Sequence, residues 1–146
     1  MFTESQDHLR RFFLDFFRWL GSQPEIQAVA LVGSYARDEA TNASDLDLII
    51  IASDPTKYLA EPEWVGQFGS VSRTRVEHYG KVTSLRVWYA DGLEVEYGLT
   101  DDTWAAIPLD EGTKKVVSDG MQVLFERKPM LLRGLHTPDV DNRGSR

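Results

Sequence analysis

The sequence predicts an α/β (α+β) fold in which a mixed β-sheet carries helices mainly on one of its faces. Three observations lead to this prediction. Residues 9–20 repeat apolar side chains with a helical period, short strands and helical segments then alternate as far as residue 68, and amphipathic strands follow from residue 74. This order of elements is typical of a sheet that mixes parallel and antiparallel strands.

Length and composition predict one domain. The chain has 146 residues, 42% of them hydrophobic, and we expect residues 1–135 to form a single domain and residues 136–146 a flexible tail. The net charge of −7 argues against a nucleic-acid-binding surface and suits metal ions, metal-bound nucleotides or cationic small molecules. The sequence contains no cysteine, which excludes disulfides, thiolate metal sites and thiol nucleophiles.

Neither a membrane span nor a secretion signal is visible in the sequence. No stretch approaches the roughly 20 apolar residues of a transmembrane helix. The N-terminus lacks the charged, apolar and small-residue regions of a signal peptide. We therefore expect a cytoplasmic protein that makes no membrane contact.

The N-terminal segment is the clearest helix. Its apolar residues recur at intervals of three and four, which places them on one broad stripe of an α-helix. The stripe comprises Leu9, Phe12, Phe13, Phe16, Phe17 and Leu20. Gly21 is a natural end for this helix, and we expect the stripe to cover a sheet.

Short strands and helical segments alternate in the next part of the chain. The expected elements are a buried strand at 26–32 (IQAVALV), a helix from Ser34, a strand at 45–52 (DLDLIIIA), a turn at Asp54-Pro55 and a short helix at 62–68. Gly33 separates the first strand from the helix that follows it.

Strands dominate the remainder. The expected elements are strands at 74–79, 84–90, 93–100 and 121–126 and a final helical turn or two at 129–135. Asp91-Gly92 separates the second and third of these strands, and this dipeptide favours a two-residue type I′ hairpin turn.

Two carboxylates stand at the start of the strand at 45–52. Side chains alternate along a strand, so Asp45 and Asp47 share one face while the apolar residues between and after them share the other. Like charges this close repel each other unless a cation lies between them. Mg²⁺ prefers carboxylate oxygens and also binds phosphates, so the pair is a candidate metal site, although a half-exposed strand also carries such pairs without function.

The glycine and serine after the first strand are a candidate phosphate site. A glycine between a strand and a helix lets backbone N–H groups approach a phosphate closely, and the start of a helix favours negative charge. The structural alternative for Gly33 and Ser34 is an ordinary turn glycine with a helix-capping serine.

Gly33-Ser34, ten intervening residues and then Asp45-Leu46-Asp47-Leu48 resemble the signature of the DNA polymerase β-like nucleotidyltransferase superfamily. The runs "GSYAR" and "SDLDLII" resemble the small bacterial members in particular, namely the aminoglycoside-type and the minimal nucleotidyltransferases. The resemblance covers roughly residues 27–99 and implies a third carboxylate on a neighbouring strand.

Glu94 and Glu96 are the candidates for this third carboxylate, because both lie on one face of the strand at 93–100. With a two-residue turn at Asp91-Gly92, Trp88 pairs with Val95, and the glutamates face away from the core. The core face then consists of Trp88, Leu93, Val95 and Tyr97. The family's pattern after "DG" favours Glu96, so we expect Asp45, Asp47 and Glu96 to project together.

The resemblance also implies roles for these residues. Asp45, Asp47 and Glu96 bind metal, with two Mg²⁺ ions and a nucleoside triphosphate such as ATP, and Glu96 helps to deprotonate the acceptor. Gly33 and Ser34 position phosphates. Arg37 is expected to pair with phosphate oxygens, or alternatively with the neighbouring acidic residues, and Ser44 to steady the loop before the metal site.

Three functions follow as hypotheses. The first is metal-dependent transfer of a nucleoside monophosphate, AMP for preference, to the hydroxyl of an acceptor, for example a small molecule such as an aminoglycoside. The second is an antitoxin-like minimal nucleotidyltransferase that binds, and adenylylates, a helical toxin partner. The third is a non-catalytic nucleotide-binding module, against which the complete set of three carboxylates counts. The short chain also leads us to expect a homodimer or a helical protein partner.

Overall fold

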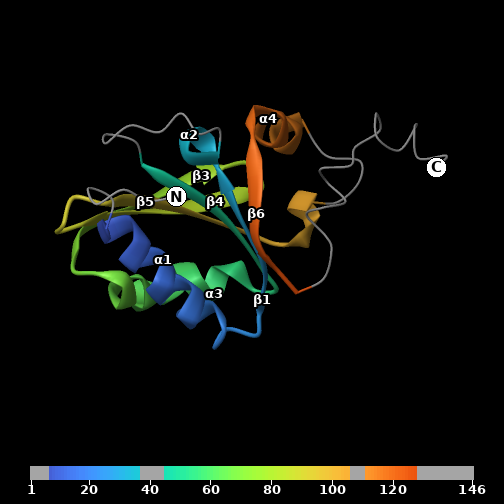
Figure 1. The fold of residues 1–146 in the computed structure, drawn as a ribbon. Helices are drawn as coiled ribbons and strands as arrows, with labels where there is room; N and C mark the ends of the chain where they lie inside the picture. The colour runs from blue at the N-terminus through green and yellow to red at the C-terminus, as the bar shows by residue number, and fades with distance from the viewer. Residues whose placement is uncertain (1–6, 37–44, 106–110, 128–146) are drawn as a thin grey trace.

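The computed structural model describes residues 7–36, 45–105 and 111–127, whose strands form one mixed sheet in the order β3-β4-β5-β2-β1-β6 (Figure 1). The strands are β1 (Ile26–Val32), β2 (Leu46–Ala52), β3 (Val71–Tyr79), β4 (Val82–Tyr89), β5 (Glu94–Thr100) and β6 (Met121–Glu126). The pair β2·β5 is parallel, and the other neighbouring strands are antiparallel. The predicted mixed sheet is therefore confirmed.

Helices lie on both faces, with most of the buried apolar side chains on one of them. The helical segments are α1 (Asp7–Leu20), α2 (Gly33–Ala36), α3 (Pro55–Ala60), η2 (Pro62–Phe68), η3 (Asp102–Ala105) and α4 (Glu111–Asp119). Figure 1 shows α1 and α3 below the sheet and α2 and α4 above it. The larger core lies between the sheet and α1, α3 and η2, and the smaller core lies between the sheet and η3 and α4.

The predicted stripe of α1 is correct in its main part. Phe12 and Phe16 are fully buried against the sheet, whereas Phe17 remains 40% exposed. Trp19 takes the place of Phe17 in the core and stacks on Trp64 of η2 with ring centroids 4.8 Å apart. The helix therefore buries a stripe shifted by part of a turn from the one that the spacing predicts.

The hairpin between β4 and β5 differs from the predicted two-residue turn. Tyr89 N–H donates to Leu93 O at 2.8 Å and Gly92 N–H donates to Tyr89 O at 3.0 Å, which leaves three residues in the loop. Gly92 has φ 97°, the left-handed conformation that closes such a loop. The pairing therefore moves by one residue, so that Val87 rather than Trp88 pairs with Val95. Trp88 lies on the face opposite the core, which corrects its predicted position.

Three helical segments were not predicted, namely α3, η3 and α4. The expected turn at Asp54-Pro55 is the start of α3, and α4 occupies a stretch for which the sequence indicated no element. The expected helix at residues 62–68 is the 3₁₀ helix η2. The segments at 129–135 and 136–146 lie outside the described residues, so their predicted structures are not tested. Within the described ranges, none of the helices is long and apolar enough to cross a membrane.

Candidate active site

Three carboxylates meet where β2 and β5 lie side by side. Asp45 immediately precedes β2, Asp47 lies within it, and Glu96 is the partner of Asp47 in the parallel pairing with β5. Paired residues on adjacent strands point to the same face of a sheet. One oxygen of each carboxylate lies within 4.8 Å of the other two. We call Asp45, Asp47 and Glu96 the carboxylate triad.

A backbone turn borders the triad. Val32, the last residue of β1, pairs with Asp47, and Gly33 begins α2 directly after it. Gly33 has φ 75°, a left-handed conformation that favours glycine. A Cβ at Gly33 would overlap Asp47 Oδ2 and lie 3.3 Å from its Cγ. Glycine therefore lets the backbone run directly against the carboxylate of Asp47.

The surroundings of Asp47, the inner member of the triad, disfavour its ionised form. Burial, followed by the charges of Asp45 and Glu96, raises the pKa of Asp47 to about 8. Burial also raises the pKa of Glu96, against the opposing effect of the nearby Arg86. Asp47 Oδ1 is buried and has no hydrogen-bond partner among the described residues. Since buried polar atoms normally have a partner, this oxygen is suited to a ligand.

The triad residues fit a divalent cation. Carboxylate oxygens are the ligands that Mg²⁺ prefers, and the oxygens of the triad lie close enough to share one. A cation there would satisfy Asp47 Oδ1, and its charge would favour the ionised form of Asp47. The identity of the ion and the number of ions stay predictions.

An arginine that the sequence analysis missed lies among these carboxylates. Arg86 on β4 pairs with Glu96 across the antiparallel pair β4·β5. Its Nη1 donates to Asp45 Oδ2 at 3.1 Å, and its Nη2 donates to Glu96 Oε1. The predicted register placed Trp88 on the core side, and strand alternation assigns Arg86 to the same side as Trp88. A shift of one residue moves every side chain of a strand to the other face, and for this reason the arginine was missed.

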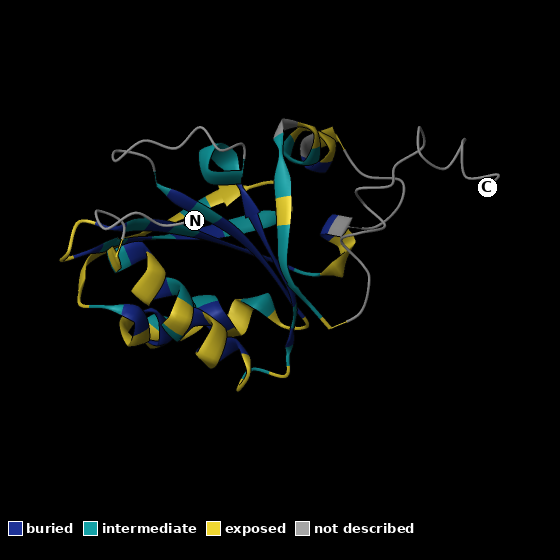
Figure 2. Cartoon of the chain, in the orientation of Figure 1, coloured by how far each residue is buried: buried dark blue, intermediate teal, exposed yellow. Residues whose placement is uncertain are grey.

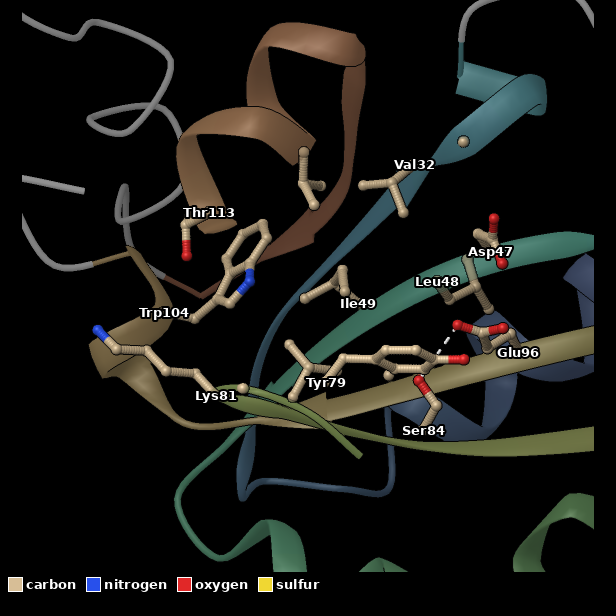
Figure 3. A pocket seen from close by; sticks show the side chains of 15 residues that line it. Val32, Asp47, Leu48, Ile49, Tyr79, Lys81, Ser84, Glu96, Trp104 and Thr113 are labelled. Atoms are coloured by element: carbon tan, nitrogen blue, oxygen red, sulfur yellow. Dashed lines mark hydrogen bonds between the residues drawn. The ribbon is translucent and has the colours of Figure 1, made fainter. Parts of the chain in front are cut away.

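A pocket opens on the same face of the sheet, beside Asp47 and Glu96 (Figure 3). Its volume is about 700 Å³, and it extends from the triad to Trp104 and Thr113, which bound its far end. Ser84 on its wall donates a hydrogen bond from Oγ to Glu96 Oε2 at 3.2 Å, the dashed line in Figure 3. The pocket therefore joins the charged end of the site to a more apolar end.

The chain that carries the triad, the glycine turn and the pocket is similar to known proteins. A family model described as a nucleotidyltransferase domain matches residues 10–124. The chain belongs to this nucleotidyltransferase family. The match confirms the resemblance to the DNA polymerase β-like superfamily that the motifs indicated. No curated protein sequence matches the chain.

One solved structure shows the same fold with a TM-score above 0.5, and two others match less closely. An aminoglycoside 6-adenyltransferase from Bacillus subtilis matches with a TM-score of 0.55 and 16% identity, over 88% of this chain and 43% of that one. The chain thus spans less than half the length of that protein. A GLD-2/RNP-8 complex matches with a TM-score of 0.46 and 18% identity, over 69% and 35% of the two chains. A cytoplasmic RNA terminal U-transferase matches with a TM-score of 0.47 and 16% identity, over 66% and 30%.

The structure separates the two glutamates that the sequence left as alternatives. Glu96 is part of the triad, whereas Glu94 contacts Arg86 Nη1 at 2.5 Å. Ser34 is half-buried and lies in α2, which contacts β2. Arg37 and Ser44 lie outside the described residues, so their phosphate-binding roles in this nucleotidyltransferase stay predictions.

Proposed function

We propose that this nucleotidyltransferase transfers a nucleoside monophosphate from a nucleoside triphosphate to an acceptor hydroxyl and releases pyrophosphate. The observation that carries the proposal is the carboxylate triad, whose oxygens lie within 4.8 Å of one another beside a glycine turn. A set of three carboxylates that close together is suited to hold Mg²⁺, and Mg²⁺ also binds the phosphates of a nucleotide.

Each part of the site has a role in this proposal. Asp45, Asp47 and Glu96 hold the metal, which when bound neutralises negative charge on the phosphate oxygens. The turn at Gly33 and Ser34 presents backbone N–H groups to the phosphates. Glu96 accepts the proton of the acceptor hydroxyl, whose oxygen bonds to the α-phosphorus while the bond from that phosphorus to pyrophosphate breaks. The raised pKa of Glu96 favours proton uptake.

We extend the proposal to ATP as the donor and a small molecule, such as an aminoglycoside, as the acceptor. The pocket of about 700 Å³ beside Glu96 supports a small acceptor, because pockets of this size bind small ligands. The net charge of −7 supports a polycationic acceptor. We also infer a cytoplasmic location, in which both substrates occur.

The test is an assay of pyrophosphate release by the 146-residue chain. The protein is incubated with Mg²⁺, each of the nucleoside triphosphates in turn and a panel of aminoglycosides. We expect release that needs metal, triphosphate and acceptor together, and that is lost in Asp47→Asn with an unchanged circular dichroism spectrum. Metal-dependent triphosphate binding that survives unchanged in Asp47→Asn would contradict the proposed site.

The same assay distinguishes the other two hypotheses. No contact in the described part of the chain favours an antitoxin-like role, and pyrophosphate release with a small helical protein as the acceptor, but not with small molecules, would support it. A non-catalytic module would bind the triphosphate without releasing pyrophosphate with any acceptor.

A further inference from the structure

Arg86 is the centre of a charge network that extends beyond the triad. Its guanidinium contacts four carboxylates, at Asp45, Glu77, Glu94 and Glu96. These carboxylates come from β3, from β5 and from the residue before β2. The Arg86 side chain is only 16% exposed and its partner carboxylates 19–31%, so these contacts are partly shielded from water and screened less than fully exposed ion pairs.

The four carboxylates fall into two pairs. Asp45 and Glu96 belong to the triad, and the guanidinium spans the gap between them through Nη1 and Nη2. Glu77 and Glu94 lie outside the triad and contact Nε at 3.3 Å and Nη1 at 2.5 Å. Arg86 would thus keep two partners if Asp45 and Glu96 turned to another cation.

The need for such a residue follows from the charge of the site. Without a cation, Asp45, Asp47 and Glu96 repel one another on adjacent strands. An arginine cannot lose its charge in a protein, and its fork of donors can bind two carboxylates at once. Arg86 neutralises part of the triad but leaves Asp47 Oδ1 without a hydrogen-bond partner among the described residues.

We propose that Arg86 is a positioning residue that bridges Asp45 and Glu96 while the metal site is empty. When a divalent cation binds, Arg86 releases these two carboxylates to it and stays bound to Glu77 and Glu94. This inference rests on the proposed function, because it assumes that the triad binds a metal. It assigns a role to Glu94, which the alternation of β5 places on the active face without a place in the triad.

The proposal has two measurable consequences. Arg86 stabilises the protein when no metal is bound, because its guanidinium donates hydrogen bonds to both Asp45 and Glu96. Arg86 also competes with the metal for those two carboxylates, so that it weakens metal binding. Removing it should therefore make the protein less stable without metal and should make the metal bind more tightly.

The experiment compares Arg86→Gln with Arg75→Gln. Arg75 is the partner of Arg86 in the pairing β3·β4, and it contacts Glu77 but is 59% exposed. Its removal changes the net charge equally without removing a contact to the triad. For each protein, Tm is measured in EDTA and in Mg²⁺ or Mn²⁺, and Kd for Mn²⁺ alone is measured by calorimetry.

We expect Arg86→Gln to lower Tm in EDTA by roughly 5–15 °C, with most of the loss recovered by metal. We expect its Kd for Mn²⁺ to fall about tenfold, whereas Arg75→Gln changes Kd by less than about threefold because exposed charges are screened. Equal effects of the two variants overturn the inference. If the parent protein binds no metal at all, the proposed function fails as well.

A double-mutant cycle tests the part assigned to Glu94. Glu94→Gln should weaken Mn²⁺ binding in the parent protein, because Arg86 then keeps its hold on Asp45 and Glu96, and should have little effect in Arg86→Gln. An equal weakening in both backgrounds shows only a general charge effect and overturns the anchoring role. If Arg86→Gln does not fold even with metal, Arg86→Lys replaces it. A lysine keeps the charge without the fork. We therefore expect Arg86→Lys to have a lower Tm in EDTA and a lower Kd for Mn²⁺ than the parent and Arg75→Gln. Values equal to the parent's overturn the inference.

Discussion

At the start of β2 and β5 the two faces of the sheet carry opposite kinds of residue, although they are built from alternate positions of the same strands. Further along β2 both faces are apolar, because Ile49 and Ile51 belong to the smaller core. Leu46, Leu48 and Tyr97 belong to the larger core together with residues of α1 and are at most 1% exposed. Figure 2 shows the central strands of the sheet in dark blue over much of their length. Asp47 and Glu96 point the other way and are partly exposed. The apolar contacts are non-directional and shared among many side chains, whereas the charged face depends on a few particular contacts. Stability and function should therefore respond to different mutations.

The largest expected effect is a loss of stability caused by a mutation on the apolar face. Phe16 is fully buried, and its ring lies 5.5 Å from those of Phe12 and Phe68. Phe16→Ala removes these contacts and leaves a cavity, which should lower the free energy of unfolding by about 3–5 kcal/mol. Urea unfolding measures the loss. It should be the same with and without Mg²⁺ and at pH 6 and pH 8.5, and a metal-dependent loss would contradict the separation of the two faces.

The next effect is on turnover and distinguishes two residues of one face. Glu96→Gln removes a triad oxygen and the proposed proton acceptor, so kcat should fall by about 100-fold or more. Glu94→Gln acts only through Arg86, and we expect a loss of less than about tenfold in kcat. Steady-state kinetics of pyrophosphate release measures both. The reverse order would move the third carboxylate to Glu94.

A smaller effect is expected at the turn that borders the triad. Gly33→Ala forces a left-handed conformation on alanine and pushes its Cβ into Asp47, which should cost roughly 1–3 kcal/mol and abolish the rise of Tm with Mg²⁺. Gly80→Ala is the matched control, because Gly80 has φ 58° but no atom within 4 Å of its added Cβ. The control should lose stability but keep the metal response. Loss of that response in both variants would mean that backbone strain, and not Asp47, is responsible.

The sequence predicted the elements whose structure follows from a periodic spacing of apolar residues. Alternation in "DLDLIII" placed Asp45 and Asp47 on one face, and the structure joins them to Glu96 as expected. The spacing of α1 identified Phe12 and Phe16 as core residues. In α1 a single apolar stripe decides which face is buried, and at the start of β2 the alternation of aspartate with leucine decides it in the same way.

The parts that escaped prediction depend on single residues instead. Trp88 was placed on the wrong face, and Arg86 was not predicted near the carboxylates, because the β4–β5 loop has three residues and not two. A hairpin's register follows its loop length. Helix α3 was missed because Tyr58 is the one buried residue of its described side chains, too little for a helical period. No period reveals that an arginine lies among four carboxylates, because that depends on three separate strand pairings.

The smallest expected effect has the opposite sign to the others. Burial and the charges of Asp45 and Glu96 raise the pKa of Asp47 from 3.8 to about 8, so between these values the folded protein without metal holds a proton that the unfolded chain releases. Its stability therefore falls as the pH rises from about 4 to about 8 and is level above that. An asparagine at position 47 cannot ionise, so the Asp47→Asn variant should not lose stability as the pH rises. We expect its Tm in EDTA at pH 8.5 to exceed that of the parent, with little difference at pH 4. Asp15→Asn on the exposed side of α1 is the control, and a pH-independent difference for Asp47→Asn would contradict the raised pKa. Added Mg²⁺ should reverse the order at pH 8.5, because the parent gains a bound ion and the variant lacks a ligand for it. A residue that destabilises the empty site and stabilises the filled one is the signature expected of a ligand-binding face, and no residue under α1 should show it.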